Sequence, residues 1–167
     1  MLHPLFKSMA RFNTWANSRL YEVCALLSDA EYKRDRKAFF GSIHRTLNHL
    51  LVVDQLWRGR IEGWKPSITS LDQQLHAEFE PLRHARVAED GAIVRMVDGL
   101  EPARLLRPVK YTFVDGTLAE TPLDMLLMTL FNHQTHHRGQ VHTMLSQAGV
   151  KPPPLDIIVW HREMGRP

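Results

Sequence analysis

The chain has 167 residues, of which 44% are hydrophobic, with a formal net charge of +3 and a single cysteine. This length predicts one domain over residues 1–167 whose core needs no disulfide or structural metal, and the lone Cys24 excludes an internal disulfide. The basic residues are scattered, and no apolar run approaches the roughly 20 residues of a membrane span. We therefore expect a soluble, cytoplasmic protein with no nucleic-acid or membrane partner.

The first predicted helix covers residues 4–27, and Pro4 suits its first turn. Apolar residues recur on one face at helical spacing: Leu5, Met9, Phe12, Ala16, Leu20, Val23 and Leu27. Ser28 or Asp29 then caps a short turn. The charged run at residues 33–37 that follows is expected to be a solvated loop.

The second predicted helix covers residues 41–63. Its apolar arc contains Ile43, Leu47, Leu50, Val53, Trp57 and Ile61. His49 flanks this arc, whereas Asp54 projects into its middle. A buried carboxylate needs a partner, so we favour a structural hydrogen bond from Asp54 to the first helix over a catalytic role.

The middle of the chain is less regular. Residues 65–81 form a connection, and a third helix over residues 82–100 has a weaker pattern because Gly91 interrupts it. Residues 109–120 alternate as a pair of strands around Asp115-Gly116, a two-residue hairpin signal.

The fourth long helix has Thr121 as its expected cap and Pro122 at its first position, and it includes the stretch at residues 123–147. Its core-facing arc contains Leu123, Leu126, Leu127, Leu130, Gln134, Val141, Met144 and Leu145. His133 and His137 lie in the same arc, one turn apart, where two imidazoles can share a metal ion. The alternative is a pair of buried, hydrogen-bonded histidines.

Four long amphipathic segments predict an all-α four-helix bundle with a small β-hairpin insertion before the last long helix. Bundles build metal sites between facing helices, so a third ligand should come from another long helix. His49 fits this position better than His44, which lies away from the apolar arc. The other histidines are expected outside the site, with His136 either flanking it or facing solvent: His76, His84, His136 and His142.

After Gly149 the chain breaks on three consecutive prolines, which predicts an extended tail. The tail carries apolar residues that need a partner surface: Leu155, Ile157, Ile158, Val159 and Trp160. They either cover a second copy of the chain or pack on their own bundle. We expect a homodimer, with the intramolecular arrangement as the alternative.

Two segments resemble the DinB family of the DinB/YfiT-like superfamily: FNTWANSRLYEVCALLSDAEYKRDRKAFFGSIHRTLNHLLVVDQLW at 12–57 and HQTHHRGQVHTMLSQAG at 133–149. The similarity extends over nearly the whole chain, and the H-x-x-H-H-R-G-Q run is its more specific part. The resemblance implies an up-down-down-up bundle with one long crossover. It also implies a divalent metal held by three histidines, which here would be His49, His133 and His137.

Three imidazoles suit zinc or nickel first, with iron, cobalt or manganese as alternatives, and they leave a coordination position open. The family is similar to bacillithiol- and mycothiol-dependent transferases and isomerases. The resemblance thus implies a metal-dependent enzyme of the thiol-dependent S-transferase or hydrolase type, acting on a small molecule with a low-molecular-weight thiol as a candidate partner. The alternative is a non-catalytic metal-binding protein of a damage or stress response, in which the ion is structural. Gln140 either orients a ligand of the metal or, like Arg138, serves helix packing.

Overall fold

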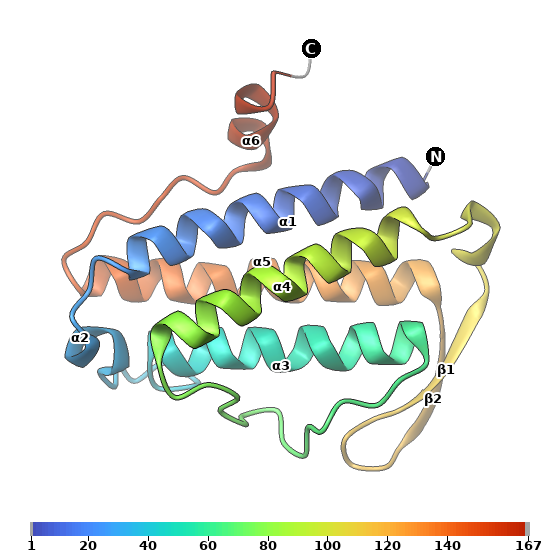
Figure 1. The fold of residues 1–167 in the computed structure, drawn as a ribbon, viewed down its shortest axis with the longest axis horizontal. Coiled ribbons are helices and arrows are strands. Elements are labelled where there is room, and N and C mark those ends of the chain that lie inside the picture. The colour runs from blue at the N-terminus through green and yellow to red at the C-terminus, as the bar shows by residue number, and fades with distance from the viewer. Residues whose placement is uncertain (1, 166–167) are drawn as a thin grey trace.

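The computed structural model describes residues 2–165, and its four long helices form a bundle (Figure 1). These helices are α1 (Leu2–Cys24), α3 (Ile43–Glu62), α4 (Phe79–Asp98) and α5 (Leu123–Gln147). In Figure 1, α1 and α5 run in one direction while α3 and α4 run in the other. The long crossover at residues 63–78 joins α3 to α4, and the order is the predicted up-down-down-up.

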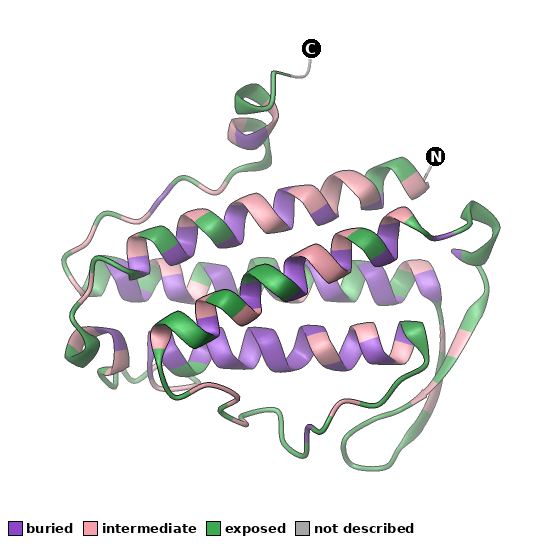
Figure 2. Cartoon of the chain, viewed as in Figure 1, coloured by how far each residue is buried: buried purple, intermediate pink, exposed green. Residues whose placement is uncertain are grey.

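Each long helix packs against two others: α1 and α3 both contact α4 and α5. Buried residues accordingly line the inner sides of all four helices (Figure 2). The core has two apolar parts, one toward each end of the bundle. Phe6, Ile61 and Leu127 belong to one part, and Leu20, Leu47 and Leu145 belong to the other. Between them lies a layer of buried polar residues, described below with the site that it adjoins.

The ends of α3 follow from its flanking residues. Ser42 accepts a hydrogen bond from the backbone N–H of Arg45, which satisfies one free donor of the first turn. At the other end, Gly63 adopts φ 84°, and its N–H donates to the carbonyl of Gly59. Only glycine adopts this left-handed conformation readily, so the sequence fixes the end of the helix here.

The start of α5 differs from the prediction. Thr121 does not cap the helix, because it pairs with Val109 in the hairpin, and Pro122 precedes the first helical residue. The strand runs directly into the helix, so backbone carbonyls satisfy its first donors. The N–H groups of Leu123 and Asp124 donate to carbonyls just before the hairpin.

The hairpin consists of β1 (Pro108–Thr112) and β2 (Leu118–Pro122), paired antiparallel and preceded by the short 3-10 helix η1 (Pro102–Arg104). Its turn is longer than the predicted two residues. Phe113 donates its N–H to the carbonyl of Thr117, which leaves a three-residue loop that ends on Gly116 at φ 89°. A left-handed glycine at this position is typical of such loops.

The end of the first long helix and the start of the third also differ from the prediction. The first long helix ends at Cys24 instead of continuing to residue 27, and Ser28 caps a separate helix α2 (Asp29–Lys33). Helix α4 begins three residues earlier than predicted and passes through Gly91 without a break. A helical glycine costs about 1 kcal/mol relative to alanine, which packing against two neighbouring helices offsets.

The predicted extended tail contains one helix, α6 (Ile157–Glu163), which packs on α1. The ring of Trp160 meets that of Phe12 edge-on at 5.9 Å and is buried against its own chain. Glu163 accepts hydrogen bonds from Trp15 and Arg19 of α1. Within residues 2–165, no helix has the length and apolar character needed to cross a membrane.

Candidate functional site

Three histidines predicted to act together meet between α3 and α5: His49, His133 and His137. Their ring centroids lie 4.3 to 5.0 Å apart, and one nitrogen from each ring lies within 4.8 Å of the others. The shortest approach joins the Nε2 atoms of His49 and His133, at 3.0 Å. Helical spacing aligns His133 with His137, and the packing of α3 against α5 adds the third ring.

Hydrogen bonds fix the orientation of two of these rings. The Nδ1 atom of His49 lies 2.7 Å from the carbonyl oxygen of Leu71, and that of His137 lies 2.7 Å from Oε1 of Gln140. Both oxygens only accept, so each Nδ1 carries the proton and donates it. The Nε2 atoms therefore present lone pairs, as they do in histidines that bind a metal through Nε2 and donate from the other nitrogen.

His133 lacks such support. Its Nδ1 atom is buried and has no hydrogen-bond partner among the described residues, while its Nε2 atom faces the lone pair of His49. Either tautomer leaves one nitrogen of His133 unsatisfied or sets two lone pairs against each other. A cation between the Nε2 atoms removes the repulsion of the lone pairs, although the Nδ1 proton of His133 still lacks an acceptor. Ligand nitrogens around a tetrahedral zinc ion, at bonds of about 2.0–2.1 Å, lie about 3.3 Å apart. The Nε2 atoms of His49 and His133 lie 3.0 Å apart, which is close to this value.

The three imidazoles are held neutral. Burial, together with the neighbouring rings of His137, His49 and His136, lowers the pKa of His133 to about 3. Burial lowers the pKa of His137 to about 4, although its bond to Gln140 opposes the shift. Burial also lowers the pKa of His49. Protons therefore do not compete for the ligand nitrogens at neutral pH.

A cavity of about 530 Å³ opens on this cluster. Phe40 forms one wall, with its ring stacked on His49 at a centroid distance of 4.0 Å. Phe39 stands at the mouth with 85% of its surface exposed. The remaining lining residues come from the crossover and from α5: Ser70, Leu71, Asp72, His136 and Gln140. The cluster is thus reachable by a small molecule from solvent.

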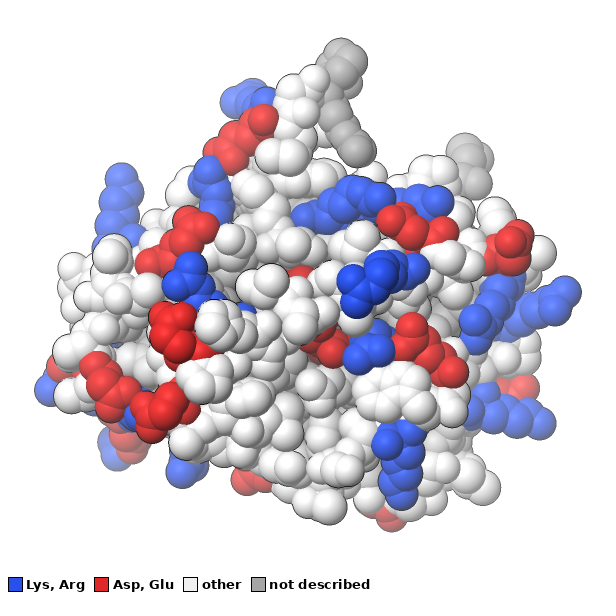
Figure 3. All heavy atoms as spheres, in the orientation of Figure 1, with Lys and Arg blue, Asp and Glu red and all other residues white. Residues whose placement is uncertain are grey.

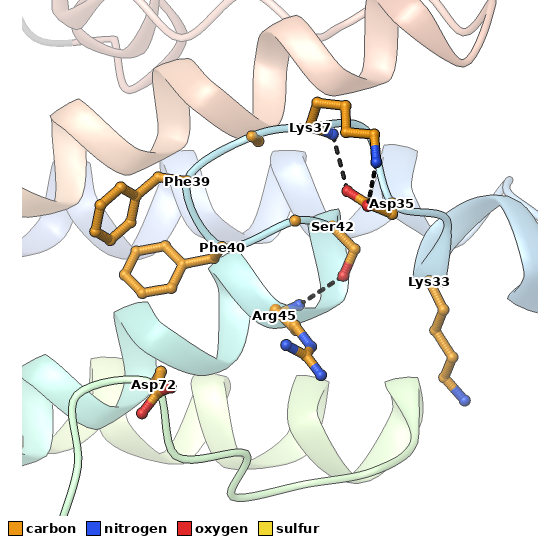
Figure 4. A pocket seen from close by; sticks show the side chains of 10 residues that line it. Lys33, Asp35, Lys37, Phe39, Phe40, Ser42, Arg45 and Asp72 are labelled. Atoms are coloured by element: carbon orange, nitrogen blue, oxygen red, sulfur yellow. Dashed lines mark hydrogen bonds and ion pairs between the residues drawn. The ribbon is translucent and has the colours of Figure 1, made fainter.

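A second cavity, of about 780 Å³, shares Phe39, Phe40 and Asp72 with the first. Figure 4 shows the rings of Phe39 and Phe40 next to each other on one side of the loop, while the ion pair of Lys37 and Asp35 lies on the other side. Arg45 also lines this cavity, together with the carboxylates of Asp35 and Asp72. Besides their hydrogen bonds, its positive charge is among the causes that lower the pKa of both carboxyl groups, so the charges beside the mouth of the histidine cluster are mixed.

A buried polar layer crosses the bundle next to the histidines. Asp54 lies 2.7 Å from Arg86 of α4 and accepts a hydrogen bond from Gln134 of α5. The expectation that Asp54 would bond to the first helix is therefore wrong, because its side chain points toward α4 and α5. Burial raises the pKa of Asp54 to about 7, and the guanidinium of Arg86 opposes that rise.

The same layer reaches α1 through Asp90 and Arg138. Asp90 accepts hydrogen bonds from Asn13 and Asn17, and Arg86 lies 2.8 Å from its carboxylate. Arg138 donates to Asn13 and Asn17 and is buried, so its role is packing within the core. The guanidinium nitrogens of Arg86 contact both carboxylates at ion-pair distance but without hydrogen-bond alignment.

The remaining histidines lie outside the cluster. His136 is exposed at the rim of the cavity and bonds to Gln140, and His84 is exposed on α4. His44 was expected to point away from the core, but it is buried under α2, where its ring meets Tyr32 edge-on at 5.1 Å. The helical arc of α3 could not show this, because α2 covers a second face of the helix.

The sequence did not identify the residues that shape the mouth. Phe39, Phe40, Leu71 and Asp72 belong to connections without a helical period, so no spacing links them to the histidines. The adjacent pair of phenylalanines in a charged loop was the available signal.

Comparisons with known proteins concern the family and the fold of the chain. The chain is 26% identical over 151 residues to Protein DinB of Bacillus subtilis (strain 168), an alignment that covers 87% of each chain. Its fold is similar to the crystal structure of a DinB-like protein from Bacillus cereus ATCC 10987, with a TM-score of 0.65, 20% identity, and coverage of 84% of this chain and 91% of the other. The model of the DinB family matches residues 1–165. The chain therefore belongs to the DinB family.

Proposed function

We propose that this chain is a metal-dependent enzyme that holds one divalent ion, zinc or nickel first, through His49, His133 and His137. One observation carries the proposal: three neutral imidazoles converge beneath an open cavity, and no carboxylate or thiol among the described residues joins them. A closed structural site normally has four protein ligands, whereas a catalytic site keeps a position for a substrate.

The residues around the cluster support a positioning role. Gln140 and the carbonyl of Leu71 fix two imidazoles through their Nδ1 protons, so the ligand set is preorganised. Phe40 covers one face of His49 and excludes water from it. Phe39 and Leu71 offer apolar contacts to the incoming molecule at the mouth.

The reaction type that we propose is a thiol-dependent S-transfer or a hydrolysis. When bound, a divalent ion supplies Lewis acidity that lowers the pKa of a thiol or water ligand toward neutrality. The apolar mouth and the cavity of about 530 Å³ support a small molecule as the substrate, with a low-molecular-weight thiol as the candidate co-substrate.

Metal analysis of the purified protein tests the ligand set. We expect one divalent ion per chain, lost in each of the variants His49→Ala, His133→Ala and His137→Ala. The matched controls His76→Ala and His84→Ala lie outside the cluster and should keep the ion. Full occupancy after loss of any of the three cluster histidines would overturn the assignment.

A cobalt-substituted sample distinguishes the enzyme from a protein whose ion only ties α3 to α5. If a position is open, the visible spectrum should change when a small thiol is added. A screen of electrophiles with several low-molecular-weight thiols, with and without added metal, then looks for turnover. An unchanged spectrum at saturating thiol would favour the non-catalytic alternative, a damage- or stress-response protein with a structural ion.

A further inference from the structure

A separate cavity of about 760 Å³ lies at the far end of α3 from His49, between the crossover and the hairpin. The crossover runs close to the helix at Gly59, where a side-chain Cβ would lie only 2.6 Å from the carbonyl oxygen of Trp64. This glycine therefore permits the backbone contact that holds one wall of the cavity in place. Tyr111 and Phe113 of the hairpin region form the opposite wall.

Arg60 projects into this cavity with its charge uncompensated. Its guanidinium lies over the rings of Trp57, Tyr111 and Phe113 at 4.5 to 5.3 Å, and it forms no ion pair with any described residue. Partial burial lowers the pKa of Arg60, as expected for a cation without a carboxylate partner. Arg58, two residues earlier, instead contacts Glu89 at 2.6 Å and Glu62 at 2.7 Å.

The surroundings of Arg60 are basic. Lys65 and Lys110 also line the cavity, and none of its lining residues is acidic. A smaller adjoining cavity of about 410 Å³ shares Arg60 and adds Arg104, Arg107 and one carboxylate, that of Glu62, which forms an ion pair with Arg58. Figure 3 shows basic side chains along the edge of the molecule that carries η1 and the hairpin. An anion entering here would meet several positive charges and few competing carboxylates.

Flat apolar surfaces border the same cavity. Trp64 and Phe113 line it and are each more than a third exposed. Arg58 lies over one face of Trp64 and Arg60 over one face of Phe113, so the opposite faces are the ones that can stack on a planar ring. The guanidinium of Arg60 provides donors for the anionic group of such a ligand. Neither feature is used by the histidine cluster.

We propose that this cavity binds a small planar aromatic anion. The guanidinium of Arg60 pairs with the carboxylate or phosphate group of the ligand, assisted by Lys65, and the ring of the ligand stacks on Trp64 or Phe113. The cavity lies at the far end of α3 from the histidine cluster, so binding of this ligand does not require a metal ion there.

Titration of the full-length protein with 1-naphthyl phosphate, followed by backbone amide chemical shifts in NMR spectra, tests the proposal. We expect saturable shifts confined to residues 59–69 and 110–114, the same with and without added zinc. Inorganic phosphate and the neutral 1-naphthalenemethanol serve as separate arms, and each should bind at least tenfold more weakly. Shifts located elsewhere, or equal binding of either partial ligand, would overturn the proposal.

Two variants and one control locate the interaction. Arg60→Gln should weaken the binding of 1-naphthyl phosphate at least tenfold. Lys65→Gln changes an exposed residue that does not contribute to the core, so it should fold normally and weaken binding about threefold. Arg83→Gln on α4, which lies outside the cavity, should leave binding unchanged. Unchanged affinity in both cavity variants would refute the assignment even if Arg60→Gln lowered stability.

Discussion

Replacing Arg86 with methionine is the sharpest test of the buried polar layer. Arg86 is 2% exposed, and its guanidinium lies 2.7 Å from Asp54 and 2.8 Å from Asp90. Methionine has a similar length and fills much of the same space. The variant therefore removes the cation but leaves two buried carboxylates between the apolar ends of the core.

The expected cost follows from the burial of both partners. Breaking a buried ion pair by removing one member costs about 3–5 kcal/mol, because the other charge stays buried without compensation. Arg138 cannot replace the lost cation, since its guanidinium donates to Asn13, Asn17 and Gln134. We expect Arg86→Met to lower the free energy of unfolding at pH 7 by about 4 kcal/mol, a large share of a typical total of about 5–15 kcal/mol.

The loss should depend on pH. Without Arg86, the pKa of Asp54 in the folded protein rises further above its value of about 3.9 in the unfolded chain. The folded variant then binds a proton that the unfolded chain has released, so its stability falls as the pH rises from about 4 through neutrality. The unmodified protein shows the same fall only up to its own Asp54 pKa of about 7, so the difference between Arg86→Met and the unmodified protein should be larger at about pH 9 than at pH 7.

Urea unfolding, followed by circular dichroism at both pH values, measures these differences. The matched control is Arg83→Met, which removes an arginine from the same helix but from an exposed pair with Glu80, where the expected loss is about 0–1 kcal/mol. Adding Asp54→Asn to Arg86→Met should recover part of the stability. A loss at pH 7 no larger than that of Arg83→Met would refute the reasoning.

Three further predictions concern the site and the assembly. In metal-free protein, the pKa of His133 is near 3, so below pH 6.5 the unfolded chain binds a proton that the folded chain excludes, and stability should fall by up to about 2–3 kcal/mol between pH 6.5 and 4.5. Urea unfolding of His133→Ala should show a weaker pH dependence of stability. A pH dependence equal to that of the unmodified protein would contradict the assignment. Gln140→Ala removes the acceptor for His137 and should weaken metal affinity about 10–100-fold in a competition titration with a chelator, whereas unchanged affinity would show that this bond does not support the ligand. We also propose that the chain forms a homodimer through the exposed Ile157 and Ile158 of α6, so light scattering at high micromolar concentration should give twice the chain mass of 19.3 kDa, and the monomer mass would exclude it.

The sequence alone determined the main helices and the paired histidines, because both depend on local spacing. Residues four apart on a helix point the same way, so His133 and His137 had to converge once α5 formed. Choosing His49 needed the further argument that metal sites in bundles lie between facing helices, together with the family resemblance. The hairpin was predicted for a related reason, since alternating residues around Asp115-Gly116 define paired strands.

Only the tertiary structure decided which charged residues meet across the bundle. Arg86 lies on α4, whose apolar pattern in the sequence is interrupted by Gly91, and no periodicity shows that Arg86 will contact Asp54 instead of solvent. The mouth of the histidine site and the cavity at Arg60 depend in the same way on where the connections run over the helices. Contacts between distant segments are set by helix packing and by the paths of loops, neither of which leaves a regular spacing in the sequence.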